Sequence, residues 1–172
     1  EALTLADRIA IMKNGVIQQL ADPHTIYNKP TNLYVAGFIG SPSMNFIPGT
    51  LDGATFTAEE GTKIPVGAYE FLGPRTAASK AVLGVRPEHI LLGEAARDMP
   101  FQTSAEIEIV EPMGSETLAW TKVAGIPVTF RCSSDIPLAA GDKVTVGFDI
   151  GRGSLFDAGT EWWHLPENAA EE

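Results

Sequence analysis

Residues 140–148 read Ala140-Gly-Asp142 and then Lys143-Val-Thr-Val-Gly-Phe148, a turn followed by a stretch of alternating side chains. Glycine and aspartate favour tight turns, because glycine accepts positive φ angles and the aspartate carboxylate can bond nearby backbone amides. In the second part every other side chain is apolar, from Val144 to Phe148, which is the period of a strand with one buried face. The stretch therefore predicts a strand in a β domain.

Short apolar runs of the same kind follow one another from Phe46 onward. They alternate with turns that contain Gly, Pro or Asp at intervals of about 8–12 residues, the spacing of a small sandwich or barrel. The predicted strands are Phe46–Leu51, Thr55–Ala58, Ala81–Arg86, Ser104–Val110, Thr117–Val123, Pro127–Arg131, Lys143–Phe148 and Ser154–Phe156. The chain is therefore expected to be mainly β.

The first forty residues differ from this pattern. Apolar runs on either side of Asn14-Gly15 predict a β-hairpin, because both residues tolerate the positive φ angles of a type I′ turn. Asp22 before Pro23 predicts the N-cap of a short helix. Asn32 predicts the start of a second helix over residues 33–39. Because this second helix is apolar nearly all round, we expect it to be buried between layers.

The net charge also differs between the first forty residues and the rest of the chain. The formal net charge is −10, and residues 1–40 carry as many acids as bases, so the whole excess lies beyond residue 40. An acidic surface without a basic stripe repels phosphate backbones, which argues against nucleic-acid binding as the main role. The change in charge also suggests a domain boundary near residue 40.

Composition points to a globular, cytoplasmic protein. The longest nearly uncharged apolar stretch, Leu33 to Ile39, is far shorter than the roughly 20 residues of a membrane-spanning helix. No positively charged start followed by an apolar run marks a signal peptide. The single cysteine, Cys132, cannot form an internal disulfide, which favours a reducing compartment. Its expected role is that of a small buried hydrophobe.

No catalytic or metal-binding constellation is visible in the sequence. It lacks a G-x-x-x-x-G-K-[ST] phosphate loop and a G-x-G-x-x-G dinucleotide motif, and Gly151-Arg-Gly153 is interpreted as a loop between strands. His24, His89 and His164 lie far apart and lack the spacing of metal ligands. We therefore predict no catalytic residue, bound cofactor or metal in this fragment.

Four carboxylates allow one enzymatic alternative, the acid and base pair of a glycosidase. They are Glu106, Glu108, Glu111 and Glu116. The spacing favours a structural role, because the first two share the solvent side of a predicted strand whose buried side includes Ile107 and Ile109. The other two flank a turn and could bond its amides.

Several multi-residue motifs resemble one known family. The first half contains Glu1-Ala-Leu-Thr-Leu-Ala-Asp-Arg-Ile9, Gly15-Val-Ile-Gln18 and Phe38-Ile-Gly-Ser-Pro-Ser-Met-Asn-Phe46. The second half contains Gly84-Val-Arg-Pro-Glu-His89, Val110-Glu-Pro-Met-Gly-Ser-Glu116, Ala140-Gly-Asp142 and Leu155-Phe-Asp157. In this order they resemble the ATP-binding subunits of maltose-type (MalK/UgpC-like) sugar importers of the ATP-binding cassette class. The resemblance covers nearly the whole chain, with a departure at Pro112-Met113 and little match over residues 58–80.

The resemblance implies a division into parts. Residues 1–40 would be the C-terminal remnant of a nucleotide-binding domain, a hairpin plus two helices, and residues 41–46 would be the joint. Residues 47–166 would form an OB-type (TOBE-like) regulatory domain, and residues 167–172 a flexible acidic tail. The expected fold class is thus mainly β, an OB-type β-barrel regulatory domain preceded by a small α+β remnant.

By the same resemblance, the function is that of the regulatory and dimerisation region of a transport ATPase that powers import of sugars or related solutes. The fragment itself is not expected to be an enzyme, because the family's ATP-hydrolysing motifs lie upstream of Glu1. ATP and magnesium are expected for the intact subunit. The expected partners are a second copy of the subunit in a homodimer, transmembrane permease subunits at the cytoplasmic face of the membrane, and a regulatory protein or small effector. An oxyanion- or effector-binding domain is the alternative, and an OB-fold nucleic-acid module is a weaker one.

The candidate site residues form two groups. The joint consists of Phe38, Ile39, Gly40, Ser41, Pro42, Met44, Asn45 and Phe46, and its apolar members should be mostly buried. The landmarks of the regulatory domain are Gly84, Arg86, Pro87, Glu88, Glu111, Gly114 and Glu116. Arg86 precedes proline, which restricts it to an extended backbone. Its guanidinium is expected to organise the barrel by pairing with Glu88, Glu111 or Glu116.

Overall fold

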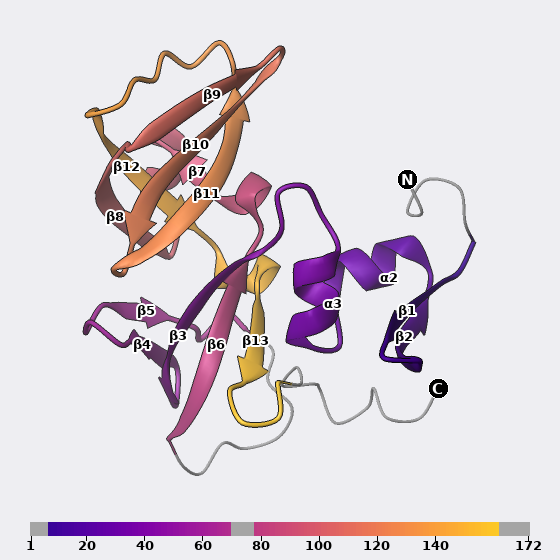
Figure 1. Cartoon of the computed structure of the whole chain (residues 1–172). Coiled ribbons are helices and arrows are strands. Elements are labelled where there is room, and N and C mark those ends of the chain that lie inside the picture. Colours follow the sequence, from indigo (N-terminus) through magenta and orange to yellow (C-terminus); the bar gives the residue numbers. More distant parts are fainter. Residues whose placement is uncertain (1–6, 70–77, 162–172) are drawn as a thin grey trace.

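The computed structural model describes residues 7–69 and 78–161 (Figure 1). Its N-terminal part contains a hairpin and two short helices that lie beside the remaining strands. These elements are β1 (Ile9–Lys13), β2 (Val16–Ala21), α2 (Pro23–Asn28) and α3 (Leu33–Phe38). We refer to them together as the N-terminal unit.

The local signals in the N-terminal unit act as predicted, with one exception. Asn14 and Gly15 adopt φ angles of 51° and 79°, as the hairpin turn requires. Asp22 accepts a hydrogen bond from Thr25 N and Asn32 accepts one from Val35 N, so both act as N-caps.

The expectation that the second helix is buried all round is wrong. Val35 and Ala36 are buried, but Phe38 is 62% exposed. The helix packs against the hairpin on one side, through Val35 in the small cluster with Ile9 and Ile11. Apolar composition alone cannot show how many neighbours a helix has, and this helix presents Phe38 to solvent.

A five-stranded antiparallel sheet follows the joint. Its strands are β3 (Asn45–Asp52), β4 (Thr55–Ala58), β5 (Lys63–Pro65), β6 (Ser79–Val85) and β13 (Ser154–Asp157). The strand order is β13-β6-β3-β4-β5, so the strand nearest the C-terminus pairs with the middle of the chain. This sheet therefore combines strands from the start, the middle and the end of the β part.

Two three-stranded antiparallel sheets complete the β part. One has the order β7-β12-β8, with β7 (Leu91–Leu92), β12 (Lys143–Phe148) and β8 (Phe101–Glu106). The other has the order β11-β10-β9, with β11 (Ile126–Ser133), β10 (Glu116–Val123) and β9 (Ile109–Met113). The short helix α4 (Glu94–Arg97) and the 3₁₀ turns η1 (Pro87–His89) and η2 (Ile150–Arg152) lie between strands. The sequence reading missed α4, β5 and β7, because elements this short have too few residues to show a period.

The predicted single strand Ser104–Val110 is wrong. The chain leaves β12 at Ile107, whose N–H donates to Asp142 O, and joins β10 at Glu108, whose N–H donates to Trp120 O. One stretch thus belongs to two sheets. The change shifts the alternation by one residue, so Ile109 is 56% exposed instead of buried.

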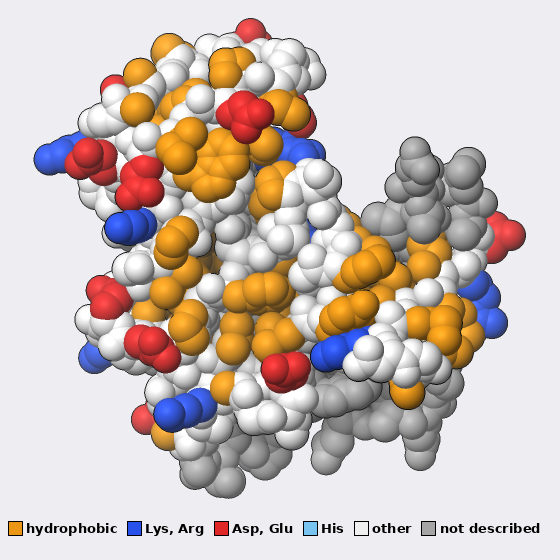
Figure 2. All heavy atoms as spheres, viewed as in Figure 1, with side chains coloured by type: hydrophobic (Ala, Val, Ile, Leu, Met, Phe, Trp, Pro, Cys, Tyr) orange, Lys and Arg blue, Asp and Glu red, His pale blue; other side chains and the backbone are white. Residues whose placement is uncertain are grey.

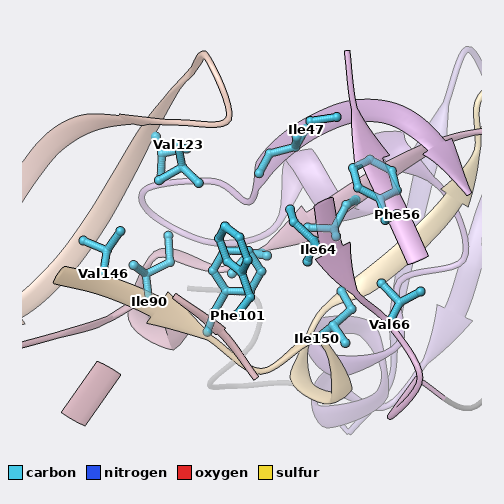
Figure 3. Close-up of a cluster of buried hydrophobic side chains, with 14 of the residues drawn as sticks. Ile47, Phe56, Ile64, Val66, Ile90, Phe101, Val123, Val146 and Ile150 are labelled. Atoms are coloured by element: carbon cyan, nitrogen blue, oxygen red, sulfur yellow. The ribbon is translucent and has the colours of Figure 1, made fainter. Parts of the chain in front are cut away.

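One apolar core runs through the whole β part (Figure 3). It joins Ile47 and Phe56 of the five-stranded sheet to Val123 and Phe130 of the sheet β11-β10-β9 and to Val146 of the third sheet. Ile47, Phe56, Val123 and Val146 carry labels in Figure 3. Because these side chains are nearly fully buried, the three sheets share one interior.

Candidate functional site

Arg86 is the most unusual buried residue in the described part of the chain. It follows the last residue of β6, its backbone is extended (φ −70°, ψ 144°) as a residue before proline requires, and it is only 2% exposed. Its guanidinium crosses from the β part into the N-terminal unit. There Nη1 donates to Ala36 O at 3.3 Å and to Ile39 O at 2.6 Å, and Nη2 donates to Tyr27 O at 2.9 Å.

The three carbonyls share one property: each lies at the C-terminal end of a helix. Ala36 and Ile39 belong to the last turn and the C-cap of α3, and Tyr27 to the last turn of α2. Carbonyls at such ends lack partners within the helix and carry partial negative charge, so a cation is well placed beside them. The Tyr27 ring also lies 4.3 Å from the guanidinium carbon, within the range of a cation–π contact.

This arrangement corrects the expected pairing of Arg86 with a carboxylate. Its hydrogen bonds go to backbone carbonyls, and Glu116 instead approaches Arg131, with Oε2 3.5 Å from Nε. Burial lowers the pKa of Arg86 to about 10, which still leaves it a cation at neutral pH. We infer that carbonyl dipoles and an aromatic face compensate part of the desolvation cost of this buried charge.

The joint around Arg86 is built to leave room for the guanidinium. Gly40 has a φ of +107°, and a Cβ there would lie 3.1 Å from Arg86 Nη1 and 3.2 Å from Pro42 O. A side chain is therefore disfavoured at Gly40 both by backbone strain and by lack of space. Ser41 O accepts a hydrogen bond from Arg131 Nη2, and the Ser41–Pro42 peptide bond is cis.

Asn45 connects the end of the joint to the sheet β11-β10-β9. Its side-chain Oδ1 accepts from Thr129 N at 2.9 Å, and Nδ2 donates to Thr129 O at 2.8 Å and to Val85 O at 3.2 Å. The amide thus replaces one residue of a neighbouring strand and bonds β11 to β3 and β6. The sequence placed Asn45 in the joint but gave no sign of this role.

The apolar residues of the joint are buried to different degrees. Ile39 and Met44 are 7% and 5% exposed, Phe46 is half-buried, and Phe38 is exposed and stacks on Tyr34, with ring centroids 5.9 Å apart. The expectation of burial is therefore wrong for Phe38. Its neighbours Gly40 and Ser41 are exposed too, and Pro42 is half-buried.

At two of the landmark positions the surrounding structure explains why the residue is glycine. At Gly84 a Cβ would overlap Met44 Sδ, so the position must stay small for the methionine to pack as it does. Gly114 has a φ of +79° in the turn between β9 and β10. Pro87 and Glu88 belong to η1, and Glu111 is exposed on β9. These landmarks thus shape the backbone, and the structure does not gather them around one point.

The remaining candidates lie apart. His24 is exposed, and His164 lies outside the described residues. His89 is partly buried, which lowers its pKa, and Arg152 adds to the shift. Burial raises the pKa of the Cys132 thiol. Over residues 7–69 and 78–161, no group of three or more His, Cys, Asp or Glu could hold a metal ion, and no helix is long and apolar enough to cross a membrane.

Two features were missed by sequence reasoning. The partners of Arg86 are backbone carbonyls, which leave no trace in a sequence. The exposed apolar face on the sheet β11-β10-β9, which includes Ile109 and Met113, depends on the shift at Ile107–Glu108 described above. The sequence reasoning placed Ile109 on the buried side of the predicted strand Ser104–Val110 and Met113 in the turn that follows it, so it did not show that both are exposed on one strand.

Comparisons with known proteins agree with this architecture. Residues 40–90 match the family described as MalK OB fold domain, and residues 83–156 match the family described as TOBE domain. Arg86 lies where the two matches overlap. The expected fold class, mainly β with OB-type domains, is confirmed.

Curated relatives cover almost the whole chain. The ABC transporter ATP-binding protein YcjV of Escherichia coli O157:H7 is 41% identical over 163 residues, which are 94% of this chain and 44% of that protein. The ABC transporter ATP-binding protein y4oS of Sinorhizobium fredii is 38% identical over 93% of this chain and 42% of its own length. The chain therefore spans less than half the length of these relatives.

A solved structure shares the fold. The cytoplasmic molybdate-binding protein ModG, with molybdate bound, is similar with a TM-score of 0.51 at 13% identity, covering 64% of this chain and 94% of that chain. At this identity the likeness shows the fold alone. The sequence relatives and the two domain matches together show that the chain carries a MalK OB fold domain and a TOBE domain and is homologous to part of proteins named ABC transporter ATP-binding protein.

Proposed function

We propose that this chain is the C-terminal regulatory and dimerisation region of a transport ATPase subunit that powers import of sugars or related solutes. The observation that carries the proposal is the match of residues 40–156 to the MalK OB fold and TOBE domains within relatives named ABC transporter ATP-binding proteins. Its partner is the same region of a second subunit, so that the two subunits stay together while their nucleotide-binding parts move. The subunit would lie at the cytoplasmic face of the membrane against its permease partners.

Arg86 gives this role a physical basis. A regulatory domain can influence a neighbouring domain only if the two are mechanically connected. Arg86 connects them here, because a side chain from the β part holds the C-terminal ends of α2 and α3. A shift of the regulatory region would therefore move these two helices with it.

ATP and magnesium are proposed to bind the part of the subunit that this chain does not span. The described residues offer no cluster of metal-ligating side chains and the sequence no phosphate loop, so these groups do not fit the chain itself. The fragment is accordingly proposed to be non-enzymatic. Titration of the chain with a fluorescent ATP analogue at micromolar concentration should show no stoichiometric binding, and saturable binding would contradict the proposal.

Sedimentation equilibrium of the chain at high micromolar concentration tests the cross-subunit role. Because each copy carries a net charge of −10, association should strengthen with added salt up to physiological strength, where the screening length is about 8 Å. A strict monomer at low and moderate salt would contradict the role. It would be refuted fully if the intact subunit also dimerised equally well after deletion of residues 47–172.

Oxyanion binding is the second candidate, because the cytoplasmic molybdate-binding protein ModG shares this fold. Few basic residues beyond residue 40 are available to hold an anion. Calorimetric titration of the chain with molybdate and with sulfate distinguishes the candidates. Saturable heat with either anion, combined with a monomeric chain, would favour the oxyanion function.

A further inference from the structure

The sheet β11-β10-β9 has one side in the core and one side in solvent. Along β10 the residues alternate, with Thr117, Ala119, Thr121 and Val123 buried. The other four, Glu116, Leu118, Trp120 and Lys122, point to the opposite side and are exposed or half-buried. We call this side of the three strands the outer face.

The outer face is more apolar than a solvent side needs to be. Ile109 of β9 lies opposite Trp120, and Met113 of β9 lies opposite Glu116, and each of the two β9 residues is 56% exposed. Figure 2 shows hydrophobic side chains gathered over this sheet, with acidic side chains beside them. A contiguous apolar patch rimmed by charged residues is typical of a surface that binds another protein.

The charges on the outer face are nearly balanced, unlike those of the chain. They comprise the carboxylates of Glu108, Glu111 and Glu116 and the cations of Lys122 and Arg131. In a chain with a net charge of −10, a second copy approaches with least repulsion at a face of this kind. Local charge therefore favours a second copy over a strongly charged partner of either sign.

The order of residues along β10 is complementary to itself. From one end to the other, its outward side chains are an acid, an aliphatic residue, an aromatic residue and a base: Glu116, Leu118, Trp120 and Lys122. If a second β10 is laid across it in the opposite direction, each acid meets a base and each leucine meets a tryptophan. Two-fold symmetry produces such a self-complementary contact with one surface used twice.

We propose that two copies of this chain associate through their outer faces, with the two β10 strands packed face to face and antiparallel. Glu116 then lies against Lys122 of the partner subunit, and Leu118 lies against the partner's Trp120. This inference rests on the proposed cross-subunit function and names its surface. The existing contacts do not prevent it, because Lys122 Nζ is 3.8 Å from Glu108 and Arg131 Nε is 3.5 Å from Glu116, and the Lys122, Glu108 and Glu116 side chains are 46–60% exposed.

The size of the outer face predicts a weak dimer. Eight residues at about 3.4 Å each, on three strands about 4.8 Å apart, give a face of about 27 by 14 Å, or about 400 Å². A standard stable interface buries about 800 Å² on each partner. Association of the isolated chain should therefore lie in the micromolar range or weaker, and other parts of the subunit would have to strengthen it.

Charge reversal tests the arrangement on the whole chain. The variants Glu116→Lys and Lys122→Glu should each weaken self-association by about tenfold or more, because both ion pairs become repulsive. An equimolar mixture of the two variants should associate again, since lysines at both positions of one copy then face glutamates at both positions of the other. The double variant Glu116→Lys/Lys122→Glu should also self-associate like the original chain.

Matched controls distinguish loss of the proposed contact from a general effect of net charge and from misfolding. Glu59→Lys and Lys63→Glu make the same charge changes at exposed positions beside β4 and on β5 of the five-stranded sheet. They should not reproduce the loss of association or its recovery in the mixture. Circular dichroism and thermal melting should show that all charge variants fold. Trp120→Ala should weaken association by about tenfold or more, as truncation of an aromatic residue at the centre of an interface does.

Sedimentation equilibrium on these variants tests the proposed function, the proposed surface and the antiparallel pairing separately. A chain that is monomeric at every concentration overturns both the proposed function and this surface. A dimer that survives both single reversals and Trp120→Ala keeps the cross-subunit function but overturns the outer face as its surface. A dimer that the single reversals weaken, and that the mixture does not restore, overturns the antiparallel pairing.

Discussion

The interior of the β part and its contact with the N-terminal unit are held by different forces. The β part has one apolar core shared by three sheets, whereas the N-terminal unit has its own small cluster of Ile9, Ile11, Ile26, Val35 and Ile39. Between the two, a third cluster of Ala36, Met44 and Phe156 is small, and Arg86 donates hydrogen bonds to three carbonyls. Hydrophobic burial depends on area, while hydrogen bonds depend on geometry. We therefore expect loss of a core side chain to cost the most stability, and loss of Arg86 to act mainly on the contact between the two parts.

Truncating the shared core should have the largest effect. Phe130 is fully buried in the cluster that joins all three sheets. We expect Phe130→Ala to lower the free energy of unfolding by about 3–5 kcal/mol, because it removes buried apolar area and leaves a cavity. Urea denaturation followed by circular dichroism measures this. The control Thr129→Ala, on the outer face of the same strand, should change the value by less than about 0.5 kcal/mol. Equal effects of the two variants would mean that the sheets do not share one core.

Removing the buried cation should loosen one contact rather than the whole fold. We expect Arg86→Met to cost about 2–4 kcal/mol, because the helix-end carbonyls lose a charged donor while the aliphatic packing is kept. Hydrogen exchange should become faster in α2 and α3 and stay unchanged in β11. Arg86→Lys should be intermediate, since an ammonium group cannot bond three carbonyls and stack on Tyr27 in the same way.

Two results would limit the role of Arg86. Arg97→Met is the control, because Arg97 is exposed and its ion pair with Glu94 at 2.8 Å lies on the surface, so its loss should cost less than about 0.5 kcal/mol. If Arg86→Met kept full stability but abolished binding of a transport effector, the residue would belong to a binding site and not to the contact between the parts.

The joint should show an intermediate effect. The expectation from the sequence that Phe46 is mostly buried would imply a loss of about 3–5 kcal/mol for Phe46→Ala. The ring is half-buried and meets Phe156 edge-on, with centroids 6.2 Å apart. We therefore expect about 2 kcal/mol. Phe38→Ala, at the exposed end of α3, should cost less than about 1 kcal/mol. A thermal melt unchanged by Phe46→Ala would show that the joint is a loose linker.

The smallest expected effect is a pH dependence at His89. Burial lowers its pKa below 6.5, and Arg152 and Arg86 act in the same direction while Glu88 opposes them. As the pH falls below 6.5, the unfolded chain takes up the proton first, so stability falls until the pH passes the lower pKa of the folded state. The free energy of unfolding, measured from about pH 7.5 to about pH 5, should lose part of this slope in His89→Gln. An identical slope in both proteins would contradict the assignment.

Much of the local structure could be predicted from the sequence, because its signals act over a few residues. Asn14-Gly15 has the φ angles that the hairpin needs, Asp22 and Asn32 cap the helices they precede, and Arg86 before proline is extended. Strand Thr55–Ala58 begins and ends where its alternation does. In each case the favourable backbone angles or hydrogen bonds are made with near neighbours in the chain, so no distant partner has to be known.

The candidate site was only partly predictable, for the opposite reason. Sequence reasoning chose Arg86 but assigned it a carboxylate partner, because charge is visible in a sequence and the free carbonyls of a helix end are not. It placed Asn45 in the joint without its bonds to Thr129, which lies 84 residues away. Both contacts exist only after strands and helices from distant parts of the chain have packed together.

The sequence alone determined the family resemblance, the mainly β character of the chain and the positions of the turns, because these depend on composition, motifs and short-range preferences. Only the tertiary structure decided which faces meet. The alternation over Ser104–Val110 is consistent with one strand, and the exchange of partners from β12 to β10 at Ile107–Glu108 divides it in two and turns Ile109 outward. Side-chain alternation fixes which residues share a face of a strand, but burial is settled by the neighbouring sheet, and that neighbour is chosen by long-range pairing.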